Sequence, residues 1–404
     1  MVTNKEQNKL NVPHLRFPEF HGEWCVSTIG EQFDLYSGNT PSRLNKEHFE
    51  GNVNWITSGE LKEHYISDTK EKISEDAATA NNLKLLHPGT FVIAIYGLEA
   101  DGVRGTGSIT CKESTISQAC MAFTQKGDVK NEFLYSWYKK HGNIIGIKYA
   151  QGTKQQNLSY DILEKFHIAY PSQDEQDKLI KFISLLDERI ASQSKLIEDL
   201  KKLKSAIIDY AINSLDTNFA KFGSLYEMAG EGGTPTTSNA SFYDNGNIPF
   251  IKIDDLKQKY LTENKDFITE LGLQKSSAWL VPTHSILFSN GATIGEISIT
   301  TYPVCTKQGI LGIVPMQNID VEFLYYFMSS SYFKKAVSRI VTEGTMKTAY
   351  LKDINNILCP IPTKEKQQEI AKMPSTLNSK IDFEQSILKL FCSQKQYLLR
   401  QMFI

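Results

Sequence analysis

Apolar residues in the middle of the chain follow an alternating spacing of four and three. The stretch from Asp174 to Asn213 contains neither Gly nor Pro, and its apolar positions are Leu179, Ile183, Leu186, Ile190, Ile197, Leu200 and Ile207. Gln193 and Lys204 fill the two remaining positions of the same seam. This spacing predicts one long helix with a coiled-coil seam.

The seam recurs 191 positions later, polar gaps included. The second set of apolar positions is Ile370, Leu377, Ile381, Leu388, Phe391 and Leu398, with Glu384 and Lys395 in the places of the two polar gaps. Pro374 stands where the first copy has Ile183. Because a proline inside a helix removes a hydrogen bond, we expect a kink or a new helix start near Ser375, or an irregularity near the helix start that does no harm.

The two stretches that precede these helices have a different pattern. Runs such as "GTFVIAIYG", "HSILFSNGATIG" and "GILGIVP" are rich in Val, Ile and Phe and end at Gly or Pro, which predicts short strands. Patches such as "NEFLYSWYKKHG" and "VEFLYYFMSSSYFKKAV" have helical spacing. Each stretch is therefore predicted to be a mixed α/β globule.

The globules are also copies of one another. "GNTPSRLNKEHFEGNVNWITSGEL" (38–61) matches "GGTPTTSNASFYDNGNIPFIKIDDL" (232–256), Gln118 lies opposite Gln308, and "FLY" at 133–135 lies opposite "FLY" at 323–325. The order of the matches is preserved throughout. We predict four parts: a first globule (1–171), a first long helix (172–215), a second globule (216–362) and a second long helix (363–404).

Two helices of this length in one chain are buried most economically against each other. If the helices pack antiparallel, the two globules are related by a pseudo-two-fold axis. Paired modules that are held at a fixed separation in this way match half-sites along a DNA duplex. The amino-acid sequences of corresponding loops in the two globules differ strongly, for example "YGLEADGVRGTGSITCKESTIS" against "NGATIGEISITTYPVCTK". This difference favours two unlike half-sites, since an identical dimer would serve a palindrome better.

These features together resemble the specificity subunits of type I restriction–modification enzymes. The resemblance rests on Trp24 with Gly30, "YSGNTPS" (36–42), the pair "GNVNWI" and "GNIPFI", the glycine-bracketed turns near 97–102 and 291–295, and "PSQDEQDKLI" at the first helix start. It covers essentially the whole chain. The second helix opening, "TKEKQQEI", departs from the Pro-x-x-x-Glu-Gln opening of the family.

The resemblance implies two target-recognition domains that read a bipartite, asymmetric sequence in double-stranded DNA. The helices would set the gap between the half-sites and dock two methyltransferase subunits, and restriction–translocase subunits would join outside them. This chain would need no cofactor, whereas its partners would use S-adenosylmethionine, ATP and Mg²⁺.

Composition limits the alternatives. The net charge of −2 argues mildly against nucleic acid, but a bulk sum cannot separate a basic face from an acidic one. No apolar run approaches the roughly 18 residues that span a bilayer, and the first twenty residues have no secretion signal. The six cysteines form no Cys-x-x-Cys pair, which is typical of reduced thiols in the cytoplasm.

Catalytic motifs are scarce. The sequence has no Pro-Pro-aromatic motif for a flipped adenine and no phosphate loop, and its Glu-x-Lys triplets are more simply interpreted as surface. We therefore expect a non-catalytic subunit. A nuclease or methyltransferase with its own repeats, and a purely structural coiled-coil scaffold, remain the alternatives.

Candidate DNA-binding residues are polar side chains in the turns of both globules. In the first globule they are Thr40, Ser42, Arg43, Tyr96, Arg104, Lys154, Gln155, Gln156 and Asn157; in the second they are Thr234, Thr236, Lys252, Asn290, Lys307, Lys347 and Thr348. Arg, Gln and Asn suit base edges, and Lys suits phosphate. The competing interpretation, about equally good, is of tight turns and polar hairpin tips. Gln118 and Gln308 are interpreted as structural amides that cap a strand.

Overall fold

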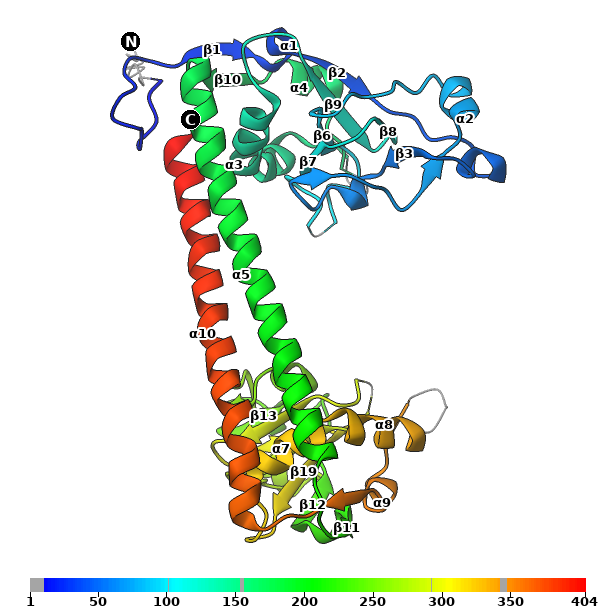
Figure 1. Ribbon diagram of the computed structural model, residues 1–404, viewed down its shortest axis with the longest axis vertical. Helices are drawn as coiled ribbons and strands as arrows, with labels where there is room; N and C mark the ends of the chain where they lie inside the picture. The colour runs from blue at the N-terminus through cyan, green and yellow to red at the C-terminus, as the bar shows by residue number, and fades with distance from the viewer. Residues whose placement is uncertain (1–10, 101, 153–155, 292, 342–346) are drawn as a thin grey trace. The chain divides into compact units, whose positions relative to one another are not determined.

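The computed structural model describes residues 11–100, 102–152, 156–291, 293–341 and 347–404. The chain divides into two compact units, residues 1–193 with 387–404 and residues 194–386. Each unit contains one globule together with parts of both long helices. The labels below are those of Figure 1.

Unit 1 is built on a five-stranded sheet in the order β2-β9-β6-β7-β4 and a three-stranded sheet in the order β5-β3-β8. Its strands are β1 (Cys25–Thr28), β2 (Phe33–Ser37), β3 (Val53–Ile56), β4 (Tyr65–Ile66), β5 (Lys72–Ile73), β6 (Phe91–Ala94), β7 (Gly107–Thr110), β8 (Ser114–Ile116), β9 (Cys120–Gln125) and β10 (His167–Tyr170). Its short helices are α1 (Ile29–Gln32), α2 (Glu75–Ala80), α3 (Asn131–Tyr149) and α4 (Tyr160–Glu164).

Unit 2 repeats this topology strand for strand, with orders β12-β19-β16-β17-β14 and β15-β13-β18. Its strands are β11 (Phe219–Lys221), β12 (Tyr226–Glu231), β13 (Ile248–Ile251), β14 (Tyr260–Leu261), β15 (Asp266–Ile268), β16 (Ile286–Ser289), β17 (Ile297–Thr300), β18 (Cys305–Thr306), β19 (Ile310–Pro315) and β20 (Leu358–Pro360). Its short helices are α6 (Glu270–Gln274), α7 (Val321–Ser329), α8 (Ser331–Ile340) and α9 (Leu351–Ile354).

The internal repeat predicted from the sequence is therefore confirmed as a repeat of structure. In both large sheets the central strands pair antiparallel and the last strand pairs parallel, β4 with β7 and β14 with β17. One difference between the copies lies in the helix that follows the large sheet. The single helix α3 corresponds to two helices, α7 and α8, because Ser330 leaves the helical conformation and caps α8 with its side chain.

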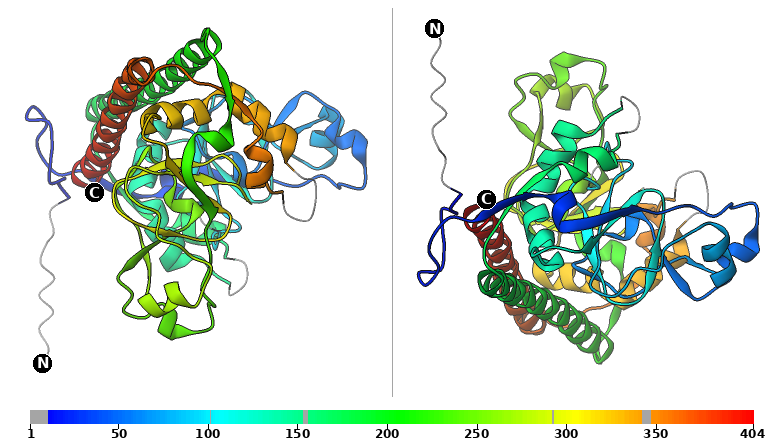
Figure 2. Two further views of the ribbon diagram at one scale, coloured as in Figure 1. Left: turned by 90° about the horizontal axis from the view of Figure 1, so that it is seen from below. Right: turned by 90° about the horizontal axis from the view of Figure 1, so that it is seen from above.

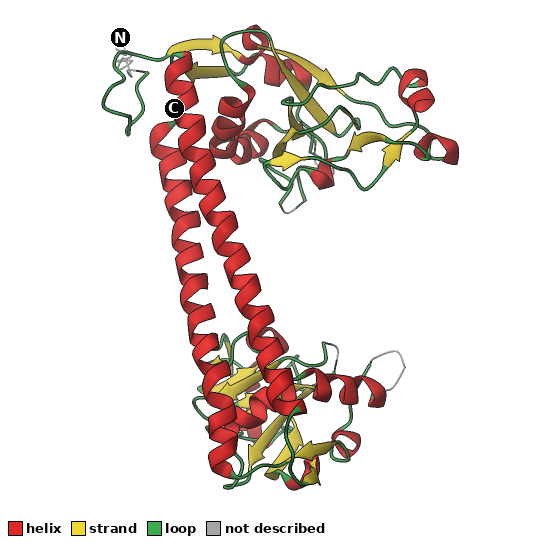
Figure 3. Ribbon diagram, viewed as in Figure 1, coloured by secondary structure: helices red, strands yellow, loops and turns green. Residues whose placement is uncertain are grey.

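Each globule buries its own core between the large sheet and the helix that follows it. In unit 1 the fully buried rings of Phe33, Phe91 and Phe133 lie in a cluster that also takes in Leu179 and Ile183 of the long helix. In unit 2 Phe222, Phe288 and Phe333 have the same role. The helices drawn red in Figure 3 cover these yellow sheets on one side.

The two long helices are α5 (Gln173–Asn213) and α10 (Lys364–Met402), and Figures 1 and 2 show them side by side. Lys395 pairs with Asp187 in unit 1, whereas Lys204 donates to Asn378 over 2.8 Å in unit 2. Later residues of one helix thus meet earlier residues of the other, so the pair is antiparallel. None of the thirteen predicted seam residues is exposed.

Pro374 lies inside α10, which runs without a break from Lys364 to Met402. The alternative of a new helix start near Ser375 is therefore wrong, and that of a harmless irregularity near the helix start agrees with the unbroken helix. A proline removes only its own N–H bond to the preceding turn. Pro374 is buried, and so are Ala371 before it and Ile381 after it, so packing offsets that loss.

Candidate nucleic-acid interface

Four separate segments of each globule meet at one end of its large sheet. In unit 2 they are residues 232–234 after β12, 290–291 after β16, 307–309 before β19 and 348–349 before α9. Gly309 accepts from the N–H of Asn290 over 3.0 Å, and Asn290 accepts from Ala349 over 2.8 Å. Gln308 donates its N–H to the hydroxyl of Thr234 over 3.3 Å. We call this set of segments the loop edge of unit 2.

Unit 1 has the same arrangement in residues 38–40, 95–98, 117–119 and 156–158, the loop edge of unit 1. Ile95 donates to Ala119 and accepts from Leu158, both over 2.9 Å, and Leu98 donates to Gln156 over 3.1 Å. The ends of these loops are thus held by main-chain bonds that do not depend on the side chains presented. Such an edge can carry different side chains on one scaffold.

The lengths of the loops at the two edges differ. In unit 1 the connection from β6 to β7 is residues 95–106, whereas in unit 2 the connection from β16 to β17 is residues 290–296. The longer loop carries Glu99 and Arg104. Its turns use glycines with positive φ, at +73° for Gly97, +78° for Gly102 and +71° for Gly105.

Arg104 and Gln156, both predicted from the sequence, are brought together at this edge. The guanidinium donates to the Gln156 side-chain oxygen over 2.8 Å, and the aliphatic part of Arg104 lies against Gly146 of α3. Glu99 accepts from the Gln156 N–H over 2.8 Å. That hydrogen bond, with a smaller contribution from the Arg104 charge, lowers the pKa of Glu99. The arginine is held in one orientation beside a carboxylate.

Two other predicted cations are engaged in ion pairs. Arg43 makes a bidentate pair with Glu71, with both distances 2.8 Å, and its guanidinium carbon lies 5.0 Å from the centre of the Phe49 ring. Lys252 pairs with Asp266 over 2.8 Å. The side chains of both pairs are exposed, so a phosphate can reach the two cations.

The remaining predicted residues divide by burial. Ser42, Thr236, Lys307 and Lys347 are exposed, and Thr40, Tyr96, Asn157, Thr234 and Thr348 are partly buried. Asn290 is only 1% exposed and donates its amide to Ala349, which makes it part of the interior of the loop edge rather than its surface. Lys154 and Gln155 lie outside the described residues.

Sequence reasoning missed Gln118 and Gln308 as candidates. Both lie at their loop edges with exposed side chains, whereas the sequence interpretation made them structural caps. Their equivalent positions in the repeat were a usable signal, because a polar residue kept in two otherwise different turns can also be kept for contact with a ligand.

A buried glutamine joins each globule to its long helix. Gln176 near the start of α5 accepts from the Lys130 N–H over 3.0 Å and donates to the carbonyls of Asp128 and Pro171 over 3.1 and 3.0 Å. Gln367 near the start of α10 repeats all three bonds, with Asp320, Asn318 and Pro362. Both side chains are almost fully buried, so each globule is tied to its helix by an identical joint.

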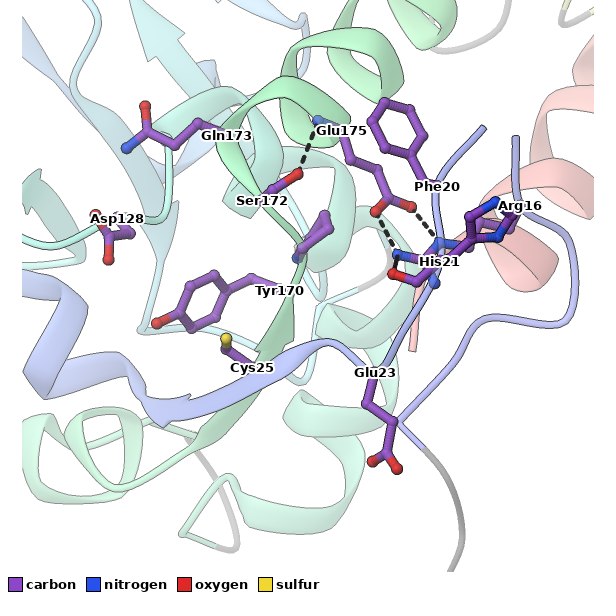
Figure 4. Close-up of a pocket in the computed structure, with 11 residues that line it drawn as sticks. Arg16, Phe20, His21, Glu23, Cys25, Asp128, Tyr170, Ser172, Gln173 and Glu175 are labelled. Carbon is purple, nitrogen blue, oxygen red and sulfur yellow. Dashed lines mark hydrogen bonds and ion pairs between the residues drawn. The ribbon is translucent and has the colours of Figure 1, made fainter. Parts of the chain in front are cut away.

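A pocket of about 480 Å³ lies at the start of α5, at the opposite end of β9 from the loop edge of unit 1 (Figure 4). Glu175 is buried there in a bidentate pair with Arg16, at 2.8 and 2.7 Å. The pair fixes the segment before β1 on the helix and is a structural contact. The pocket contains none of the predicted DNA-binding residues.

Among the residues that the structure describes, no three His, Cys, Asp or Glu side chains come together in a way that could hold a metal ion. No helix of the described chain combines the length and the apolar character that a membrane crossing needs.

The family model described as "Type I restriction modification DNA specificity domain" matches the chain twice, over residues 21–202 and 216–390. The chain belongs to this family. The two matches coincide with the two structural repeats, so each globule with its following helix is one specificity domain.

Curated relatives and solved structures agree with this assignment. The chain is 24% identical to the MjaIX specificity subunit of Methanocaldococcus jannaschii, with 89% of this chain and 88% of the relative aligned. It is 25% identical to the EcoR124I/EcoR124II specificity subunit of Escherichia coli, over 60% and 62% of the two chains. A crystal structure of the type I S subunit from M. genitalium has the same fold, with a TM-score of 0.55, 19% identity and coverage of 97% and 99%.

Proposed function

We propose that the chain is the DNA-reading subunit of a type I restriction–modification complex and that each loop edge reads one half of a bipartite, asymmetric target. The observation that carries the proposal is one scaffold present twice with different edges. Loops of different length and chemistry are held by equivalent main-chain bonds at the two edges.

In this proposal Arg104, Gln155, Gln156 and Asn157 contact bases in the first half-site, together with Tyr96, while Thr40, Ser42, Arg43 and Lys154 contact the phosphate backbone. Thr234, Thr236, Lys252, Lys307, Lys347 and Thr348 act in the second half-site, and Asn290 supports that edge from inside. The antiparallel pair α5 and α10 acts as the spacer that sets the gap.

The chain itself would carry out no chemical step. Two methyltransferase subunits, which use S-adenosylmethionine, would dock on the helices, and restriction–translocase subunits, which use ATP and Mg²⁺, would join outside them. The site of action would be the cytoplasm, where chromosomal and incoming DNA are both accessible. One solved structure, which is described as showing complex assembly of the type I system, has the same fold. Its TM-score is 0.61 and its sequence identity is 14%.

The direct test is to co-express the chain with its methyltransferase partner and to map the methylated adenines in host DNA. We expect two short, different sequence elements separated by a fixed number of unspecified bases. Methylation of a palindrome, or methylation that is unchanged when this chain is omitted, would contradict the proposal. Methyl transfer by the purified chain alone would favour the enzyme alternative instead.

A further inference from the structure

A cation from each globule is enclosed between tyrosines where the globule meets the long helices. In unit 1 the cation is His64, directly before β4, and in unit 2 it is Lys259, directly before β14. The carbonyls of both residues accept from the next strand, from Ile109 over 2.8 Å and from Ile299 over 2.7 Å. The two side chains therefore occupy equivalent places in the repeat.

The neighbours of the Lys259 ammonium come from both the globule and α10. Its ammonium lies 2.9 Å from Glu322 of α7 and 2.9 Å from the hydroxyl of Ser375 of α10. It also lies 4.7 Å from the ring centres of both Tyr260 and Tyr326. This anchor joins the globule to α10, and a lysine ammonium satisfies all of these groups.

His64 has the same kind of enclosure. Its ring stacks between Tyr65 and Tyr135, at 4.1 and 3.9 Å between centroids. Its Nε2 lies 2.8 Å from Glu132 of α3, and its Nδ1 lies 3.7 Å from Oδ2 of Asp187 on α5. The other Asp187 oxygen pairs with Lys395 of α10. The His64 ring therefore lies where the large sheet of unit 1, α3 and both long helices come together.

The two carboxylates that flank His64 favour a proton on both ring nitrogens. A neutral imidazole has one N–H, so one of the two carboxylates would face a nitrogen lone pair. Oδ2 of Asp187 is buried and accepts no hydrogen bond from any described residue, and Nδ1 of His64 lies 3.7 Å from it, while Lys395 pairs with the other oxygen. Such a buried carboxylate oxygen is costly unless the ring is charged.

We propose that His64 and Lys259 are the positioning residues that fix each globule on the helix pair, and that the first anchor is complete only while His64 is protonated. The consequence for DNA reading rests on the function proposed above. The second anchor uses a lysine, a side-chain type that stays charged well above the range in which histidine titrates. The two half-sites should therefore respond differently to pH.

The direction of the pH effect follows from the neighbours of the ring. Burial alone lowers the pKa of His64, but Asp187 and Glu132 together outweigh burial and raise it above 6.5. A group whose pKa is higher in the folded protein stabilises it fully below the unfolded value, and that contribution is lost as pH rises through the folded value. The first anchor should weaken from about neutral pH upwards.

Other titratable groups also face this site and must be separated from His64. Burial and the nearby Lys395 lower the pKa of Lys139 to about 8, and burial raises the pKa of Tyr65 to about 12. The charged and titratable groups around the ring are Glu63, Tyr65, Glu132, Tyr135, Lys139, Asp187 and Lys395. All of them are retained in a His64→Lys variant, so the difference between wild type and variant isolates His64.

The first test uses the full chain without DNA. In an NMR titration of labelled histidines, the signal that His64→Lys removes should have its midpoint above 6.5. Between pH 6 and 8.5 wild type should lose about 2–4 °C more in Tm than His64→Lys. The matched Lys259→His variant should acquire an extra loss of similar size. A His64 midpoint at or below 6.5, or the same pH profile in wild type and His64→Lys, would overturn the proposal.

The second test uses the complex with methyltransferase subunits. Discrimination against base changes in the first half-site should fall several-fold from pH 6 to 8.5 in wild type and stay level in His64→Lys, and the second half-site should change in neither. If His64 titrates as expected but discrimination in the first half-site does not change with pH, His64 is not a positioning residue. If no sequence-dependent binding occurs at any pH, the proposed function fails while the titration result stands.

Discussion

Arg104 is the predicted contact whose geometry is best defined. Its guanidinium is oriented by Gln156, and its aliphatic part lies against Gly146, where a larger residue would press on the arginine. An arginine fixed in this way loses little conformational freedom when it binds the edge of a guanine, so its contribution to selectivity should be close to that of a good bidentate contact.

Replacing Arg104 by Ala should therefore reduce discrimination at one base pair of one half-site by about 1–3 kcal/mol. Binding to competitor targets that differ at single positions measures this loss. Arg43→Ala is the matched control, because a guanidinium paired with Glu71 that contacts only phosphate affects overall affinity and not base preference. Equal loss at every position of the target would show that Arg104 does not read a base.

The buried glutamines show how much can be learned from the sequence at the residue scale. Gln176 and Gln367 stand at equivalent places in the repeat, so their joint role could have been inferred from the alignment of the two halves. His64 and Lys259 could not have been found in this way. The letters differ, and only the enclosure by tyrosines and carboxylates shows that the two cations are equivalent.

At the scale of elements, each long helix carries in its first turn a glutamine that satisfies three main-chain groups of its globule. Gln176→Ala leaves those groups buried without partners and should lower the free energy of unfolding of unit 1 by about 3 kcal/mol, and Gln367→Ala should do the same in unit 2. Chemical denaturation measures the loss. The exposed neighbours Gln173 and Gln368, replaced by Ala, serve as controls and should change stability by less than about 0.5 kcal/mol.

For Pro374 we predict that substitution raises stability, whereas substitution of the buried glutamines lowers it. Pro374→Ala restores the missing N–H and should stabilise unit 2 by about 1–2 kcal/mol, less than the roughly 3 kcal/mol helix-propensity difference because some buried ring surface is lost. Ile183→Pro at the equivalent place in α5 should destabilise unit 1 by about 3 kcal/mol or more. Thermal unfolding measures both effects. A destabilising Pro374→Ala would show that packing of the proline ring dominates.

The helices were predictable because their signal is local, a seam of apolar residues over forty positions. The division of each globule into a large and a small sheet was not. Strands such as β4, β5, β14 and β18 have only two residues, and their pairing depends on distant partners such as β7 and β17. Periodicity cannot be detected in so short a segment.

At the scale of the whole molecule, the proposed function predicts that each specificity domain reads its own half of the target, so that the halves can be changed separately. Exchanging Thr234–Pro362 for the same region of another family member should alter the second half-site only. Mapping of methylated positions in the resulting complex measures both halves at once. A change in both half-sites would mean that the domains do not read DNA independently.

The main-chain clamps at the ends of the β6–β7 and β16–β17 loops have a practical consequence for engineering. Since Ile95 and Asn290 are held by backbone bonds to the same neighbouring segments in both domains, the residues between these clamps and the next strand form exchangeable cassettes. Grafting the twelve-residue connection of residues 95–106 in place of residues 290–296 would keep the main-chain bonds at the start of the loop, and the two neighbours that hold Arg104, which are Gln156 and Gly146, would have to be supplied with it.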